Sequence, residues 1–165
     1  MRLFIVRHGI AIDRDDPACP AEAERFLTDE GTEKTRRVAR RMRAIGLEAR
    51  QWYTSPYERA RQTATIFADA LGTAKISLTE TASLLPDADP AAFIRELRRD
   101  KSQTAVAFGH APHLDVFIAA LCGAGSPITD LKKAGVACVD IVSFTPLVAR
   151  LVWLVAPKLL NLTEK

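Results

Sequence analysis

The chain has 165 residues, of which 48% are hydrophobic and 26% charged, and its 23 Lys and Arg residues outnumber 20 Asp and Glu. This length fits a single domain over residues 1–165 and excludes a multidomain machine, while the composition excludes a disordered chain. The excess of three positive charges indicates an anionic partner, but it is too small and too dispersed to predict nucleic-acid binding.

The first predicted strand is the apolar run at residues 3–6, which ends at a polar patch as buried strands do. A helix is expected after Thr28, its N-cap, with Val38, Met42 and Ile45 on one apolar stripe. The other faces of this helix are basic, and we interpret them as a solvent-exposed surface in preference to a docking site for an acidic protein. The residues concerned are Lys34, Arg36, Arg37, Arg40, Arg41 and Arg43.

A weaker strand candidate at residues 51–54 leads into a second helix. The start of this helix is marked by Ser55-Pro56-Tyr57-Glu58, which combines a capping-box Ser and Glu with proline at the first helical position. Its apolar face is expected to comprise Ala60, Ala64, Phe67 and Leu71.

Strands and helices continue to alternate in the second half of the chain. A weak strand at 76–78 precedes a helix that starts at Asp89-Pro90, and a strand at 104–108 precedes one that starts at Pro112. The last two strands, 136–144 and 150–155, flank Thr145-Pro146 and are expected to pair. This alternation predicts an α/β fold of three layers, with a mostly parallel central sheet and helices on both faces.

The three cysteines, Cys19, Cys122 and Cys138, have no CxxC or metal-ligand spacing, which argues against a disulfide framework and against a zinc module. The apolar run between Arg2 and Arg7 is too short for a signal peptide, and no run is long enough to span a bilayer. We therefore expect a cytoplasmic protein with no metal and no membrane contact.

Three polar motifs follow predicted strands. Arg7-His8-Gly9 follows 3–6, Arg59 lies in the first turn of the helix after 51–54, and Gly109-His110 follows 104–108. Ligands bind beyond the carboxyl ends of the strands in open α/β sheets, so we expect these residues to converge. Any one of them alone would be interpreted as structural, as we interpret His113.

The combination of residue types predicts a site for phosphoryl transfer. Arg7 and Arg59 offer planar forks that match phosphate oxygens, and the neutral imidazole of His8 is a competent nucleophile. Gly9 would let a phosphoryl group approach closely. His110 would hydrogen-bond the transferring oxygens, or stabilise them as a cation.

These residues resemble the histidine phosphatase superfamily, which has the phosphoglycerate-mutase-like fold. The resemblance rests on RHG at 7–9, LTDEG at 27–31, SPYERARQTA at 55–64 and Gly109-His110, in the family's order over residues 1–121. The short length and the ending at 150–160 resemble the SixA-type branch, whose members are protein phosphohistidine phosphatases.

The resemblance implies that His8 is transiently phosphorylated, that Arg7, Arg59 and His110 hold the phosphoryl group, and that no metal or organic cofactor takes part. The implied partner is a phosphohistidine-bearing protein of a phosphorelay or phosphotransfer system. A phosphatase of small phosphomonoesters with the same mechanism is the alternative, and a non-catalytic phosphoprotein-binding module ranks third. Neither the pathway nor the oligomeric state is indicated.

Larger members of the family carry an acidic residue after the third strand, where this chain has Glu80 or, at the aligned position, Ser83. A missing acid fits a phosphohistidine substrate, because an imidazole leaving group can be protonated in advance. Residues 72–89 are too few to build a lid. We therefore expect a shallow, open pocket, which suits a phosphorylated side chain on another protein.

Overall fold

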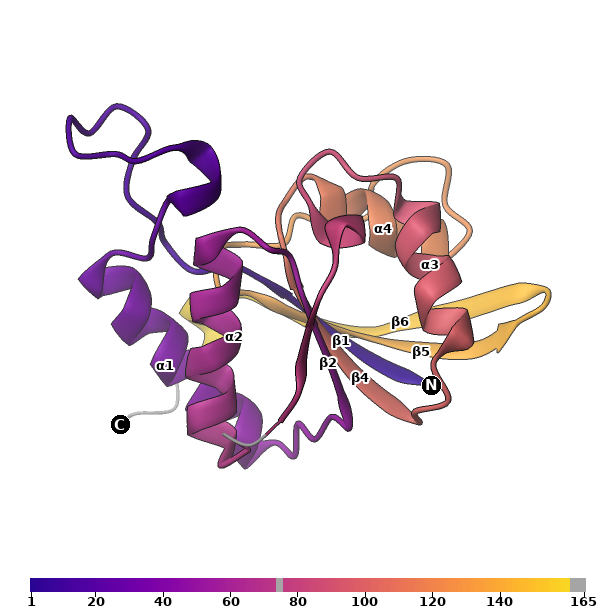
Figure 1. Cartoon of the computed structure of the whole chain (residues 1–165). Helices are drawn as coiled ribbons and strands as arrows, with labels where there is room; N and C mark the ends of the chain where they lie inside the picture. Colours follow the sequence, from indigo (N-terminus) through magenta and orange to yellow (C-terminus); the bar gives the residue numbers. More distant parts are fainter. Residues whose placement is uncertain (74–75, 161–165) are drawn as a thin grey trace.

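Runs of buried apolar residues form the strands of one six-stranded sheet in the computed structural model, which describes residues 1–73 and 76–160 (Figure 1). The elements in chain order are β1 (Arg2–Arg7), the short helix η1 (Glu22–Glu24), α1 (Asp29–Ala44), β2 (Gln51–Thr54), α2 (Glu58–Leu71), β3 (Leu78–Glu80), the short helix η2 (Ala82–Leu84), α3 (Pro90–Arg99), β4 (Thr104–Gly109), α4 (His113–Leu121), β5 (Val136–Phe144), β6 (Leu147–Val155) and α5 (Pro157–Leu160).

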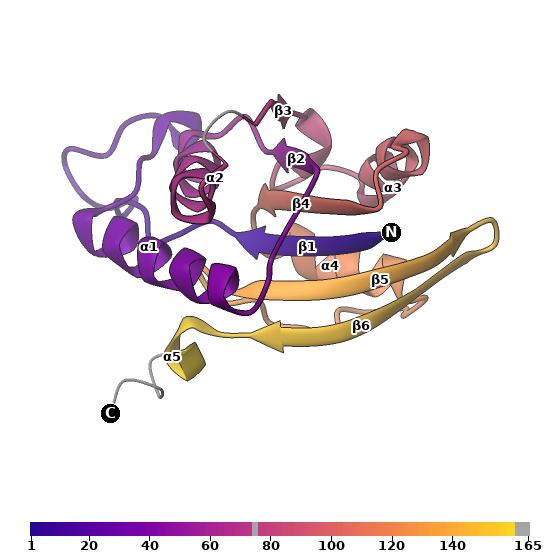
Figure 2. The ribbon, with the colours of Figure 1, turned by 90° about the horizontal axis from the view of Figure 1, so that it is seen from below.

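The sheet is mixed, with the strand order β3-β2-β4-β1-β5-β6. The first four strands in this order are parallel, whereas β5 is antiparallel to both β1 and β6. Only residues 145–146 separate β5 from β6, and so short a connection allows only an antiparallel pair. The predicted pairing is confirmed, and Figure 2 shows this hairpin reaching past the other strands.

Helices cover both faces of the sheet, as predicted. Alternate residues of β1 point to opposite sides, so Phe4 packs with α1 and α2 while Leu3 packs with α3 and α4. Figure 1 shows these two pairs of helices on opposite sides of the strands. The α1–α2 side buries Val38, Ala39, Met42, Ala64 and Phe67, and the α3–α4 side buries Phe93, Leu97, Leu114, Phe117 and Ile118.

Three details differ from the sequence-based expectations. Ile45 does not belong to the apolar stripe of α1, because the helix ends at Ala44 and Gly46, at φ +81°, turns the chain away; Ile45 is 61% exposed. The third strand is Leu78–Glu80 and not 76–78, since Leu78 is the residue that pairs with Trp52. Pairing in the hairpin runs to its tip, so β6 starts at residue 147 and not 150.

Gly31, in the first turn of α1, packs against the backbone of Ile10. A Cβ atom on Gly31 would lie 2.0 Å from the carbonyl oxygen of Ile10. We expect Gly31→Ala to lower the free energy of unfolding by about 2–3 kcal/mol, because this overlap outweighs the better helix propensity of alanine. Urea titration measures the change. Gly125→Ala, where a Cβ meets nothing within 4 Å, is the control; an equal loss in both variants would contradict this explanation.

Candidate active site

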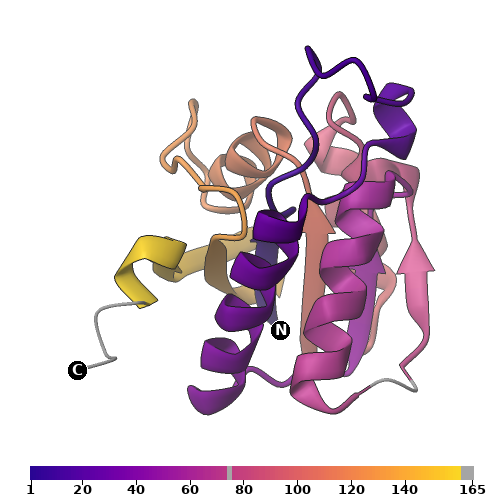
Figure 3. The ribbon, with the colours of Figure 1, turned by 90° about the vertical axis from the view of Figure 1, so that its left-hand side faces the viewer.

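The carboxyl ends of the parallel strands open onto a small cavity. His8 follows β1 directly, Arg59 is the second residue of α2, and His110 follows β4 directly. Figure 3 shows residues 10–28, in indigo and violet, at the end of the sheet toward which β4 points. The cavity has a volume of about 160 Å³ and is lined by Arg7, His8, Ala11, Arg14, Arg25, Arg59, Pro86, His110, Ala111 and Lys133. The fold thus brings together the four residues that the sequence singled out for chemistry.

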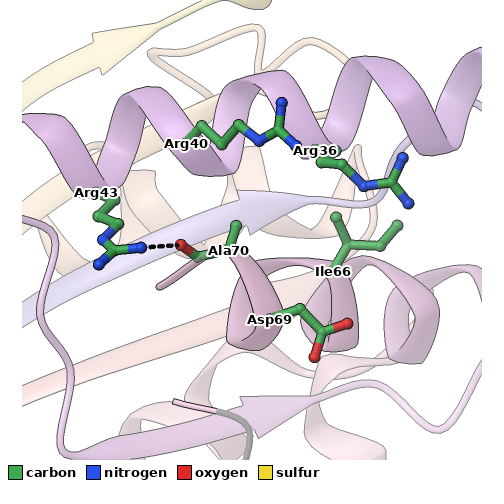
Figure 4. Close-up of a pocket in the computed structure, with 6 residues that line it drawn as sticks. All are labelled: Arg36, Arg40, Arg43, Ile66, Asp69 and Ala70. Atoms are coloured by element: carbon green, nitrogen blue, oxygen red, sulfur yellow. Dashed lines mark hydrogen bonds between the residues drawn. The ribbon is translucent and has the colours of Figure 1, made fainter. Parts of the chain in front are cut away.

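A larger hollow of about 470 Å³ lies between α1 and α2 (Figure 4). Arg36, Arg40 and Arg43 line it from α1, and Ile66, Asp69 and Ala70 line it from α2. Arg36 pairs with Glu33, and Arg43 donates a hydrogen bond to the carbonyl of Ala70 at 3.3 Å. No histidine, serine or cysteine is among these lining residues, so the hollow offers no nucleophile, and the smaller cavity is the candidate active site.

The hydrogen bonds of His8 determine which ring nitrogen is free to react. His8 Nδ1 lies 2.7 Å from the carbonyl oxygen of Gly9. Because a carbonyl only accepts, Nδ1 carries the proton and Nε2 of the neutral ring holds a lone pair. Burial lowers the pKa of His8 to about 3, and the nearby Arg59 and Arg7 act in the same direction. At neutral pH His8 therefore presents an unprotonated Nε2.

Ser55 does not form the predicted capping box, because α2 begins at Glu58 with Tyr57 as its N-cap. The Ser55 hydroxyl oxygen accepts from the Tyr57 N–H at 3.3 Å and lies 2.8 Å from His110 Nε2. Among the described residues, Nε2 is the acceptor available to this hydroxyl, so Nδ1 of His110 carries the ring proton. The serine that the sequence assigned to a helix cap instead fixes the orientation of His110.

Tyr57 was also missed by the sequence reasoning. Its ring meets the His110 ring edge-on, with centroids 5.3 Å apart, and the Arg59 guanidinium carbon lies 5.0 Å from the Tyr57 centroid. The rings of His8 and His110 are 5.1 Å apart. Tyr57 therefore contacts both an arginine and a histidine of the cavity.

We expect Ser55→Ala to lower kcat about tenfold or less while KM changes little, because His110 would lose the partner that sets its tautomer and orientation. Steady-state kinetics with phosphoimidazole measures both constants. Ser55→Thr, which restores a hydroxyl, should recover most of the loss. A Thr variant as impaired as the Ala variant would show that packing, and not the hydrogen bond, matters at this position.

Glu22, in η1, bonds three of the four arginines that line the cavity. Arg59, which is 3% exposed, donates to the Glu22 carbonyl oxygen at 2.7 Å and to Oε1 at 2.9 Å. Arg14 and Arg25 also donate to this carboxylate. The hydrogen bonds from Arg14, supported by the charge of Arg59 and by Arg25, lower the pKa of Glu22 to about 2. No sequence pattern marks Glu22 as a functional residue, because residues 10–28 lack helix or strand periodicity.

Three buried nitrogens of the cavity residues have no hydrogen-bond partner among the described residues: Arg7 Nε, Arg59 Nε and His110 Nδ1, the last a donor in the tautomer assigned above. Leaving a buried donor unpaired costs about 1–3 kcal/mol, so such groups are usually paired with a ligand, an ion or an ordered water. The remaining cationic positions on the lining are Arg14, Arg25 and Lys133. An anion with several acceptor oxygens fits this arrangement.

Close packing against α1 requires glycine at position 9, a requirement that the sequence did not suggest. A Cβ on Gly9 would lie 2.4 Å from Thr35 Oγ1 of α1, and its N–H donates to Thr63 Oγ1 at 3.0 Å. Gly9 is not part of the cavity lining. The structure therefore does not support the predicted contact between Gly9 and a phosphoryl group; glycine is needed here because α1 lies so close.

Neither candidate for the catalytic acid faces the cavity. Glu80 pairs with Arg61 at 3.2 Å, and Ser83 donates to Glu96 at 2.5 Å. No carboxylate is present in the described lining of the cavity. Pro86, which follows this region, does line the cavity. A further part of the cavity wall, which the sequence did not predict, is formed by residues 10–28 and includes Arg14 and Arg25.

His113 begins α4, is 3% exposed, and stacks on Phe117 with centroids 6.4 Å apart. It is absent from the cavity lining, consistent with a packing role. Across the chain that the structure describes, no three His, Cys, Asp or Glu side chains gather as a metal site, and no helix is long and apolar enough to cross a membrane.

We expect the protein to lose stability as the pH falls below about 6.5, because its buried histidines stay neutral. Burial lowers the pKa of His8 to about 3, of His110 to about 2, and that of His113 as well. Between the unfolded and folded pKa values the unfolded chain binds more protons, so each histidine removes up to about 1.4 kcal/mol of stability per pH unit. Urea unfolding from pH 7.5 to 4.5 measures the slope. His113→Gln should show a shallower one, and a flat profile would contradict the expectation.

Residues 3–84 match the model of the histidine phosphatase superfamily, branch 1. An uncharacterized protein of Picosynechococcus sp. is 36% identical over 140 residues, which cover 82% of each chain. The phosphohistidine phosphatase SixA of Escherichia coli K12 is 27% identical over 135 residues, covering 77% of this chain and 78% of SixA.

Solved structures give the same result over nearly the whole chain. The protein histidine phosphatase SixA in complex with tungstate superimposes with a TM-score of 0.85 at 25% identity, covering 97% of this chain and 99% of SixA. The alpha-ribazole phosphatase of Shigella flexneri shares the fold, with a TM-score of 0.76 at 17% identity and coverage of 95% and 97%. The predicted phosphoglycerate-mutase-like α/β fold is thereby confirmed.

Proposed function

The chain belongs to the histidine phosphatase superfamily, and we propose that this phosphatase removes the phosphoryl group from a phosphohistidine of another protein, through a covalent intermediate on His8. The partner would be a component of a phosphorelay or phosphotransfer system. The proposal extends the family assignment in two respects, the mechanism and the substrate.

The observation that carries the mechanism is the set of three unpaired buried donors beside a neutral His8. A phosphoryl group supplies three oxygens, which would accept from Arg7 Nε, Arg59 Nε and His110 Nδ1. These charge-assisted hydrogen bonds strengthen as negative charge develops on the phosphoryl oxygens in the transition state. The likeness to a SixA structure that holds tungstate, a tetrahedral oxyanion, supports the same type of ligand.

The reaction would proceed in two displacements. In the first, Nε2 of His8 attacks phosphorus while the bond from phosphorus to the substrate's imidazole nitrogen breaks. That nitrogen keeps the electron pair, and the proton already on the other ring nitrogen makes the departing imidazole neutral. In the second, the oxygen of water attacks the phosphorus on His8. The bond to Nε2 then breaks, a proton passes from the water to solvent, and inorganic phosphate leaves.

The lining of the cavity supports phosphohistidine over an ordinary phosphate ester. An alkoxide leaving group needs an acid to protonate it, whereas an imidazole nitrogen can be protonated before the bond breaks. The described lining contains no carboxylate, and the two histidines at its centre are held neutral. The similarity to SixA, which is named a phosphohistidine phosphatase, supports the same substrate class.

A comparison of substrates tests the proposal. We expect kcat/KM for a phosphohistidine protein or phosphoimidazole to exceed that for sugar phosphates and p-nitrophenyl phosphate by about 10²-fold or more, the rate factor that a general acid typically contributes. Efficient ester hydrolysis without phosphohistidine turnover would favour the small-molecule alternative. Phosphoprotein binding with no turnover of any substrate would favour a non-catalytic module.

A further inference from the structure

The cavity carries more positive charge than one phosphoryl group needs. Five cationic side chains line it, and the carboxylate of Glu22 offsets one of them. The two lining histidines are neutral. A phosphoryl group carries a charge of about −2 and would offset two more. Two positive charges therefore remain for other parts of the substrate.

Exposure distinguishes the side chains that would hold the phosphoryl group from those that face outward. Arg59 is buried, and Arg7 donates to the carbonyl of Leu131 at 2.8 Å. Arg25 donates to the carbonyl of Ile12 and is 12% exposed. By contrast, the Arg14 side chain is 71% exposed, and Lys133 is exposed with no bond to any described residue. Arg14 and Lys133 are therefore the cations at the mouth of the cavity.

Both of these cations are held at the cavity that His8 lines, Lys133 through its backbone and Arg14 through its side chain. The N–H of Ala134 lies 3.1 Å from the carbonyl oxygens of both Arg7 and His8, and Ala134 adopts a left-handed φ of +59°. Such a conformation is uncommon for a non-glycine residue and marks a defined turn, which places Lys133 on the lining. Arg14 is held by two hydrogen bonds to Glu22, at 2.9 and 3.0 Å.

We propose that Arg14 and Lys133 form an anion subsite that binds Asp or Glu side chains flanking the phosphohistidine of the protein substrate. This inference rests on the proposed function and specifies its substrate. Carboxylates beside the phosphohistidine would meet two exposed cations at the mouth of the cavity, where a peptide chain has access: Lys133, and Arg14, which shares Glu22 with two other arginines. Such exposed pairs select partners by a few-fold each and weaken with salt.

Two synthetic phosphohistidine peptides test the subsite. In the first, Glu flanks the phosphohistidine on both sides; in the second, Gln takes the place of each Glu, and the rest of the sequence is identical. The measured quantity is the ratio of their kcat/KM values. For the unmodified enzyme we expect a ratio of about ten in favour of the acidic peptide at low salt, falling toward one as NaCl is added. Because the ratio compares two substrates of the same enzyme, it is insensitive to the amount of folded protein.

Substitutions then assign the preference to the subsite. Lys133→Met should lower the ratio about threefold, and Lys133→Glu should reverse the preference toward a peptide with flanking Lys. Arg14→Met should lower the ratio as well, although this substitution also removes one of the three arginines that bond the Glu22 carboxylate. The matched controls are Lys132→Met and Arg37→Met, which remove exposed charges outside the cavity lining and should keep the ratio.

The outcomes separate the subsite from the proposed function. Equal hydrolysis of both peptides, or a ratio that Lys133→Met and Lys132→Met change alike, would overturn the subsite alone. Hydrolysis of neither peptide, nor of phosphoimidazole, would overturn the proposed function and the subsite with it.

Discussion

Substitution His8→Ala is expected to lower kcat by about 10⁴-fold or more for every phosphorylated substrate, the scale of loss seen when a nucleophile is removed. Of the two histidines in the described cavity lining, only His8 presents a free lone pair, on Nε2, because Nε2 of His110 is hydrogen-bonded to Ser55. Single-turnover and steady-state kinetics measure the loss. A rapid alkaline quench of the unmodified enzyme should trap a labelled phosphoryl group on the protein, and the variant should trap none.

The control for this experiment is a second buried histidine. His113 is as buried as His8 but does not line the cavity, so His113→Gln should retain most of the turnover even where it lowers stability. Thermal unfolding of both variants shows whether each is folded at the assay temperature. Turnover that persists in folded His8→Ala, with label still trapped, would mean that another residue accepts the phosphoryl group.

Removal of the Arg59 guanidinium should have the next largest effect. We expect Arg59→Ala to lower kcat/KM by about 10²–10³-fold, as happens when one preorganised donor to the transition state is lost. Arg59→Lys should recover only part of this, since an ammonium keeps the charge but not the planar fork. Inhibition by tungstate should weaken in both variants, which would show that the lost group binds the oxyanion.

Arg61→Ala is the matched control, because Arg61 lies on the same helix, is half-exposed, and pairs with Glu80 outside the cavity. It should change kcat/KM by less than about threefold, as expected for an exposed ion pair. If Arg59→Ala were no worse than Arg61→Ala, the guanidinium of Arg59 would serve only to anchor Glu22. The Arg59–Glu22 contact would then be structural.

The residues whose surroundings differ most from the sequence-based predictions lie where two distant segments meet. Ser55 followed by Glu58 has the pattern of a capping box, and nothing in that pattern reveals that His110, 55 residues away, takes the serine hydroxyl. Gly9, directly after the predicted nucleophile His8, suggests that a phosphoryl group approaches closely there, whereas a side chain at this position would meet Thr35 on α1. In both cases local chemistry was interpreted correctly, but the partner came from another part of the fold.

The sequence by itself determined the alternation of strands and helices, the three-layer architecture with a central sheet, and the position of His8, Arg59 and His110 at strand or helix ends. These features follow from local periodicity and from the rule that parallel strands end at one edge. Only the tertiary structure decided that Glu22 anchors three arginines, that Ser55 orients His110, and that Arg14 and Lys133 face the mouth of the cavity. Their roles depend on distances between segments far apart in the chain, and no short-range pattern encodes such distances.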